Sequence, residues 1–214
     1  EEMVDSYRRN PDVEYAEPNF IAYAFMTPND PYYSYQWHLD NPTYGGIQLE
    51  EAWNIQNGGS SSIVVAIIDT GIAYENDGRY CQAPDLANTC FVAGYDFVSN
   101  DSHPNDDHRH GTHVAGIVGA SNNTIGVVGV RPKIDLYAVK VLDRRGSGYL
   151  SDVIEGLDWA IANGMQVINM SLGSDISPYT CGTSDPDLEI IRNALQDGRN
   201  AGATIIVSAG NDNI

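Results

Sequence analysis

Three histidines lie within six residues of one another in the stretch DDHRHGTHVAG, which runs from Asp106 to Gly116. An imidazole can bind a metal or transfer a proton, so the cluster indicates one of these two chemistries. His110 and His113 are three residues apart and could share a helix face, but no Glu stands between them as in a zinc-binding HExxH motif. We therefore favour proton transfer by His110, with His113 as a packing residue and His108 at the rim of a cleft. Zinc stays the alternative.

A carboxylate that could orient this histidine follows the apolar run IVVAII. Asp69 opens the sequence DTG, in which Gly71 permits a sharp turn after a strand. An Asp that orients a His, which then takes a proton from a hydroxyl, is the arrangement of a serine hydrolase. Ser171 and Asn211 also follow strand-like runs, and the carboxyl ends of parallel strands meet at one edge of a sheet. Polar residues at such ends are also common turn formers.

Short β-branched runs alternate with helical patterns, which predicts an α/β fold with a mostly parallel sheet. The strand candidates are residues 63–68, 91–98, 134–141, 167–170 and 204–208. Apolar residues at helical spacing indicate helices within 151–164 and 185–202, ended by Gly164 and Gly202. In the second of these helices Leu188, Ile191 and Leu195 are expected to form a buried stripe.

Composition narrows the class of partner. A chain of 214 residues suffices for one main domain, and 11 basic against 29 acidic residues give a net charge of -18, which disfavours nucleic acid and anionic membranes. The longest apolar run is too short to cross a bilayer.

The three cysteines lack CxxC spacing. A disulfide could join Cys81 to Cys90, which would leave Cys181 without a partner in this sequence. We expect the chain to be cut from a longer protein, because it lacks an initiator Met and stops just after a strand-like run.

Five blocks of sequence together resemble the subtilisin family of serine proteases (peptidase family S8, subtilases) in its thermitase and subtilisin branch. These are VVAIIDTGI, HGTHVAGIVGASNNTIGVVGVRP, LYAVKVL, GSGYLSDVIEGLDWAIANGMQVINMSLG and VSAGN. The resemblance implies a three-layer fold around a mostly parallel sheet, truncated at the C-terminus. It assigns Asp69 and His110 to an Asp/His/Ser triad and Asn211 to an oxyanion hole. The serine of the family lies in a GTSMA motif that would follow this chain, and Ser184 in CGTSDPD is interpreted as a loop or capping residue.

The resemblance also implies a substrate cleft and a calcium site. Two edge segments would pair with an extended substrate, and an apolar pocket would be lined in part by Leu150 and Val153. The substrate-binding residues so assigned are Gly146, Ser147, Gly148, Leu150, Ser171, Leu172 and Gly173. Calcium would be bound by oxygens of Asp30, Asp85, Ser121, Asn123, Ile125 and Val127, which suits its preference for six to eight oxygen ligands.

Residues 1–25 resemble the end of an inhibitory propeptide, and residues 26–214 the catalytic domain. Processing is expected between Ala24 and Thr27, with residues 19–24 placed in the cleft. The chain departs from the family pattern at Arg109, in the long loop that carries Cys81, and in about ten extra residues after Gly173.

Together these features predict a secreted, monomeric, calcium-stabilised serine endopeptidase that acts on protein or peptide substrates and binds its own propeptide. As it stands the fragment is expected to be inactive, because the nucleophile lies outside it. Two alternatives remain open: an inactive subtilase-fold protein that binds calcium or peptides, and a metal hydrolase built on the histidines.

Overall fold

The structure is a computed structural model and describes residues 2–16, 27–41, 43, 45–56, 62–132, 134–173 and 186–211. Its helices, 3₁₀ turns and strands in chain order are α1 (Glu2–Arg8), η1 (Tyr33–Tyr35), α2 (Leu49–Ile55), β1 (Val64–Asp69), η2 (Pro84–Leu86), β2 (Cys90–Asp96), α3 (His110–Gly119), β3 (Asp135–Lys140), α4 (Leu150–Ala162), β4 (Val167–Met170), α5 (Pro186–Asn200) and β5 (Thr204–Val207).

The five strands form one sheet in the order β2-β3-β1-β4-β5, and all of its described pairs are parallel. β1 lies at the centre, with Val65 opposite Leu136 of β3 and Val167 of β4. A central parallel strand is buried on both faces, which explains the unbroken apolar run before Asp69. The predicted α/β fold with a mostly parallel sheet is therefore confirmed.

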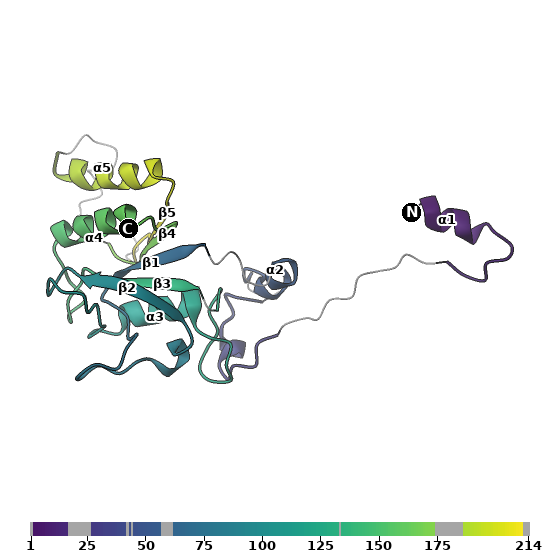
Figure 1. The fold of residues 1–214 in the computed structure, drawn as a ribbon, viewed down its shortest axis with the longest axis horizontal. Coiled ribbons are helices and arrows are strands. Elements are labelled where there is room, and N and C mark those ends of the chain that lie inside the picture. Colours follow the sequence, from purple (N-terminus) through teal and green to yellow (C-terminus); the bar gives the residue numbers. More distant parts are fainter. Residues whose placement is uncertain are drawn as a thin grey trace.

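Alternate residues of β1 supply the cores of two helical layers, as the period of a strand requires. Val65 and Ile67 belong to the cluster that includes residues of α3, whereas Ala66 and Ile68 belong to the cluster that includes residues of α4. Figure 1 shows α3 on one face of the sheet and α4 with α5 on the other. The result is a three-layer arrangement of helices, sheet and helices.

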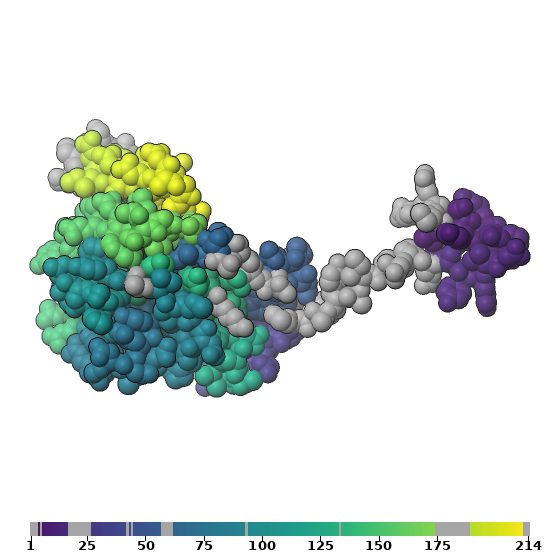
Figure 2. All heavy atoms as spheres, viewed as in Figure 1, coloured from purple at the N-terminus to yellow at the C-terminus, as the bar shows by residue number. Residues whose placement is uncertain are grey.

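In the second helical layer, the apolar side chains of the outer helix, α5, are less buried than the sequence predicts. In α4, Leu157 is fully buried, as expected from its spacing. In α5, which packs against α4 (Figure 2), the buried positions among residues 189–200 are Ala194 and Gly198, whereas Ile191 and Leu195 are only half-buried. The predicted buried stripe is thus wrong in part, because β5 is the edge strand beneath α5 and its Ile206 is half exposed. The side chain of Leu188 lies outside the described set.

All five predicted strands are present; residues 167–170 match β4 at both ends, and no end of the other strands differs by more than two residues. Gly164 and Gly202 follow the ends of α4 and α5 at φ +71° and +89°, so both predicted helix stops are confirmed. Helix α1 has no counterpart among the sequence-based predictions. No helix in the described part of the chain has the length and apolar character needed to span a bilayer.

Candidate active site

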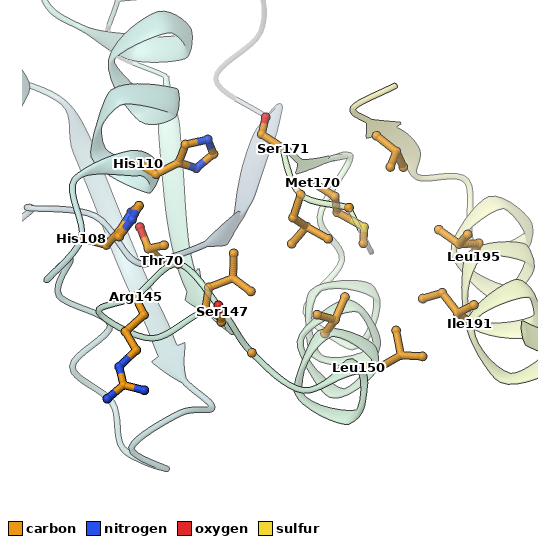
Figure 3. A pocket seen from close by; sticks show the side chains of 17 residues that line it. Thr70, His108, His110, Arg145, Ser147, Leu150, Met170, Ser171, Ile191 and Leu195 are labelled. Atoms are coloured by element: carbon orange, nitrogen blue, oxygen red, sulfur yellow. The ribbon is translucent and has the colours of Figure 1, made fainter. Parts of the chain in front are cut away.

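A pocket of about 530 Å³ opens at the carboxyl edge of the sheet (Figure 3). Its walls come from the exit of β1, the start of α3, the segment that leads into α4, the end of β4, and the faces of α5 and β5 that lie toward it. All seven residues predicted to bind substrate line it: Gly146, Ser147, Gly148, Leu150, Ser171, Leu172 and Gly173. The two predicted edge segments therefore lie at one pocket.

Asp69 and His110 meet beside this pocket. Asp69 ends β1 and is fully buried, and its Oδ1 accepts a hydrogen bond of 2.7 Å from the Thr70 amide. Nδ1 of His110 lies 2.8 Å from Oδ1 and 2.9 Å from Oδ2 of this carboxylate. Because an ionised carboxylate only accepts, the His110 ring donates its Nδ1–H and leaves Nε2 as a proton acceptor. The ring is 44% exposed and borders the pocket (Figure 3), so a hydroxyl could reach it.

Close backbone approach makes this contact possible. Gly111, next to His110, lies so near β1 that a β-carbon on it would overlap the carbonyl oxygen of Gly71 and stand 3.2 Å from Oδ1 of Asp69. Gly71 has φ +98°, and a β-carbon there would overlap the carbonyl of Pro104. Both glycines are thus required by space, and the second also by the turn that follows Asp69, as the DTG sequence predicts.

The start of α3 is held by the half-buried carboxylate of Asp106, which the sequence analysis did not single out. Asp106 Oδ1 accepts hydrogen bonds from the amides of His108 and Arg109 and from the hydroxyl of Thr70. Its Oδ2 accepts from both the amide and the hydroxyl of Thr112. Burial alone would raise the pKa of Asp106, but the hydrogen bonds from Thr112, His108 and Arg109 outweigh it and lower the pKa. The group is therefore ionised at neutral pH.

A buried cation stands at the same edge of the sheet. Lys140 ends β3 opposite Asp69 in the register and is 3% exposed. Its Nζ donates to the carbonyls of Thr70 (2.6 Å) and Leu142 (3.0 Å) and to Oδ1 of Asp107 (2.7 Å). These bonds use all three ammonium hydrogens, as a buried lysine requires. They link the turn after Asp69 to the chain that leads to the pocket wall.

The residues predicted to bind calcium gather between η2 and the loop after α3. Asp30 Oδ1 accepts from the amide of Asn123 (3.1 Å), and Asp85 Oδ2 accepts from that of Val127 (2.7 Å). Among the described residues, neither Asp30 Oδ2 nor Ser121 Oγ has a hydrogen-bond partner, although both atoms are buried. Burial raises the pKa of Asp85, and the charge of Asp30 adds to this effect. An anionic, incompletely bonded group of oxygens is the kind of site that a hard cation satisfies.

Asn123 lies between the two carboxylates of this group. Its Nδ2 is 3.1 Å from Asp85 Oδ1, and its Oδ1 accepts from the amide of Ile125 at 2.9 Å. Rotation of the amide by half a turn would present its oxygen where its nitrogen now lies. With that rotation, the oxygens of these residues would fit a calcium ion.

The predictions for Asn211, for the neighbouring histidines and for the cysteines differ in their outcomes. Asn211 is exposed and is not among the described residues that line the pocket. His113 is exposed, so its interpretation as a packing residue is wrong; His108 lines the pocket, as expected for the rim. Cys81 and Cys90 are both unpaired and exposed, without the disulfide that their spacing permits.

Several predictions fall outside the described residues. They concern Ser184, Cys181, the extra residues after Gly173, and the placement of residues 19–24. The predicted processing site between Ala24 and Thr27 falls there too, except for Thr27 itself.

Some residues at the site were missed by sequence reasoning. Thr70, Lys140 and Asp107 carry no signal in a single sequence, because their partners come from distant segments. Asp106 lies three residues before the N-cap position of α3, which is Arg109, so the usual capping pattern does not single it out either. The residues of α5 that line the pocket, Ile191 and Leu195, were predicted only as core.

Comparison with known proteins agrees with this geometry. The sequence model of the subtilase family, Peptidase_S8, matches residues 60–214. The chain is 42% identical over 99% of its length to the thermophilic serine proteinase of Bacillus sp. (strain AK1), of which it covers 47%, and 39% identical over 86% to thermitase of Thermoactinomyces vulgaris, of which it covers 58%. It thus spans about half the length of these relatives.

A solved structure supports the same conclusion. The crystal structure of a cold-adapted subtilisin-like serine proteinase matches 71% of this chain and 48% of its own with a TM-score of 0.57 at 33% identity. A family match over most of the chain, close relatives over nearly all of it, and a shared fold together establish that the chain belongs to the subtilase family.

Proposed function

We propose that residues 26–214 form the larger part of the catalytic domain of a serine endopeptidase. The observation that carries the proposal is the contact between the buried Asp69 and the pocket-facing His110. Asp69 orients the ring and stabilises its protonated form, and Nε2 of His110 takes the proton from a serine hydroxyl as it attacks the peptide carbonyl. The same nitrogen then returns that proton to the leaving amine.

The nucleophilic serine is supplied by sequence beyond residue 214, so the fragment alone is inactive. Asn211, which follows β5, would donate its side-chain amide to the developing oxyanion. Backbone segments 146–148 and 171–173 pair with an extended protein or peptide substrate from its two sides. Their positions on the walls of one pocket support this role (Figure 3).

Calcium stabilises the enzyme rather than taking part in the reaction. Asp30, Asp85 and the side chain of Asn123, with oxygens of Ser121 and the carbonyls of Ile125 and Val127, would hold it. The unpartnered Asp30 Oδ2 and Ser121 Oγ support this assignment. Bound calcium offsets the repulsion between the two carboxylates and ties the loop after α3 to the segments before β1 and β2.

Residues 1–25 are the tail of a propeptide that binds the cleft, and the mature enzyme is a secreted monomer. The acidic net charge of -18 suits an extracellular enzyme that stays in solution. Sequencing the N-terminus of the mature protein tests the processing step, and a start outside Ala24–Thr27 would contradict it.

The deciding experiment is covalent labelling of the full-length protein with a fluorophosphonate. The proposal predicts labelling of one serine C-terminal to Asn211, and loss of labelling in a His110→Ala variant. A matched His113→Ala variant keeps its labelling, because His113 is exposed and off the pocket. A folded wild-type protein that remains unlabelled and binds peptides would instead identify an inactive, peptide-binding member of the family. Zinc-dependent hydrolysis without labelling would favour the metal hydrolase.

A further inference from the structure

Asp106 is connected to both residues of the Asp69–His110 pair through their neighbours in the chain. Thr70, which follows Asp69, donates its hydroxyl to Asp106 Oδ1 at 2.9 Å. The same hydroxyl oxygen accepts from the amide of Gly111, which follows His110, at 2.9 Å. One carboxylate and one hydroxyl therefore join the exit of β1 to the first turn of α3.

The second oxygen of this carboxylate holds the next residue of the helix. Asp106 Oδ2 accepts from the Thr112 amide at 3.0 Å and from its hydroxyl at 2.5 Å. That hydroxyl in turn accepts from the amide of Ala73, at 3.0 Å, in the chain after the DTG turn. Asp106 thus receives five hydrogen bonds, which come from both segments that carry the pair.

The local backbone needs such a fixed anchor. Arg109, immediately before His110, has φ +90°, a conformation that costs a non-glycine residue about 1–3 kcal/mol. The Arg109 amide is one of the donors to Asp106 Oδ1, at 2.9 Å. The carboxylate therefore holds in place the turn that aims the His110 ring toward Asp69.

We propose that Asp106 is a positioning residue for proton transfer: it fixes the start of α3 against the exit of β1, so that His110 keeps its contact with Asp69 during turnover. This inference rests on the proposed protease function. It goes beyond ordinary helix capping, because a cap alone would affect the stability of α3 but not the alignment of the ring with a partner on another element. A neutral amide does not replace the carboxylate, because its NH₂ group would face hydrogen-bond donors in either orientation. One orientation turns it toward the amide and hydroxyl of Thr112, and the other toward the amides of His108 and Arg109.

The test uses the full-length protein and the variant Asp106→Asn, with Asp158→Asn as a matched control on the exposed face of α4. We expect Asp106→Asn to lower kcat for a peptide substrate about 10- to 100-fold, because a misplacement of about 1 Å costs roughly that much. KM should stay within about twofold, because the substrate-binding walls are untouched. The control should match the wild type in both constants.

A second pair of variants separates positioning from packing. Thr112→Ser keeps the hydroxyl that donates to Asp106, and Thr112→Val removes it at similar volume. We expect the serine variant to retain kcat and the valine variant to lower it in the same direction as Asp106→Asn. This pair also carries the test if Asp106→Asn does not fold.

A spectroscopic measurement makes the result independent of activity. The proton NMR signal of the His110 Nδ1–H, which is hydrogen-bonded to Asp69, should broaden or disappear in Asp106→Asn and persist in Asp158→Asn. Unchanged kcat and an unchanged Nδ1–H signal, with only a lower melting temperature, would overturn the inference and leave Asp106 as a helix cap. A wild type that shows the signal but neither hydrolyses peptides nor reacts with a fluorophosphonate would refute the proposed function instead.

Discussion

The Asp69 carboxylate faces Nδ1 of His110 with both of its oxygens, at 2.8 and 2.9 Å, across 41 residues of sequence. Replacement of Asp69 by Asn would set an NH₂ group or a neutral oxygen against the ring and favour the wrong tautomer. In the full-length protein we therefore expect Asp69→Asn to lower kcat at neutral pH by about 10⁴-fold, the magnitude of this change in serine proteases with the same pair. Steady-state hydrolysis of a peptide substrate measures it.

The control for this prediction is Asp197→Asn, which makes the same chemical change on the exposed face of α5. It should leave kcat and KM at their wild-type values. A loss of less than tenfold in Asp69→Asn would mean that the observed contact does not orient the proton acceptor.

The proposed calcium site should make the folding stability of the protein depend on pH, and bound calcium should oppose this dependence. Burial, with the charge of Asp30, raises the pKa of Asp85 above its usual 3.8. Without calcium, the stabilisation from protonated Asp85 is fully present below pH 3.8 and is lost as the pH rises through its folded-state pKa. In the presence of a chelator, we therefore expect the melting temperature of the wild type to include a contribution that decreases as the pH rises through this pKa. The Asp85→Asn variant should lack this contribution.

Calcium should oppose that trend because it binds the ionised carboxylates. At a hundredfold excess over its Kd, a ligand of the folded state adds about 2.7 kcal/mol of stability. Calorimetry at neutral pH should show this gain in the wild type and in Asp158→Asn, and a much smaller one in Asp30→Asn. Equal gains in all three proteins would contradict the assignment.

Much of this architecture could be predicted from the sequence because its signals are local. The apolar run of β1 and the helical spacing in α4 each depend on residues within one element, and both elements are present. The half-buried Ile191 and Leu195 show where such reasoning fails. A helical pattern indicates which face is apolar, but the depth of burial depends on what the neighbouring elements cover.

The candidate active site likewise has some features that the local sequence predicts and others that depend on tertiary packing. Asp69 could be predicted from its place after a strand, and His110 from its place at the start of a helix. The network around them could not, because the hydroxyl of Thr70 and the carboxylate of Asp106 are 36 residues apart in the chain. Their pairing follows from the close packing of α3 on the exit of β1, which only the folded chain displays.

That close packing makes a prediction about one glycine. A β-carbon on Gly111 would overlap the Gly71 carbonyl and crowd the Asp69 carboxylate, so Gly111→Ala should push α3 away from β1. We expect a loss of about 1–3 kcal/mol in the free energy of unfolding, as in other overpacked sites. A parallel loss of kcat should follow, because His110 moves with the helix. Urea denaturation and the peptide assay measure the two effects.

Gly116 offers a matched control on the same helix. Nothing lies within 4 Å of the position its β-carbon would take. Because alanine favours a helix interior over glycine by about 0.5–1 kcal/mol, Gly116→Ala should be neutral or slightly stabilising and should keep kcat. If the two variants lose stability equally, contact with β1 is not what excludes a side chain at Gly111.

The pocket wall at the start of α4 predicts which substrate side chains are preferred. Leu150 and Val153 of α4 line the pocket together with Met170 and Leu172, and none of these four side chains is ionisable. An apolar substrate side chain placed there would bury surface against Leu150, an effect of about 1.5–3 kcal/mol for a leucine or phenylalanine. Leu150→Ala should therefore lower kcat/KM about tenfold or more for a peptide that presents such a side chain.

The neighbouring residue provides the comparison. Tyr149 is 79% exposed and is not among the described residues that line the pocket, so Tyr149→Ala removes a larger side chain without changing the wall. It should leave kcat/KM unchanged across a series of peptides that differ at one position. Leu150→Ala should reduce the differences in kcat/KM across this series. The peptide with alanine at the varied position should lose little kcat/KM, whereas the leucine and phenylalanine peptides should lose most. Equal losses of kcat/KM for all peptides would mean that Leu150→Ala impairs folding rather than recognition. The apolar subsite would then not be formed by Leu150.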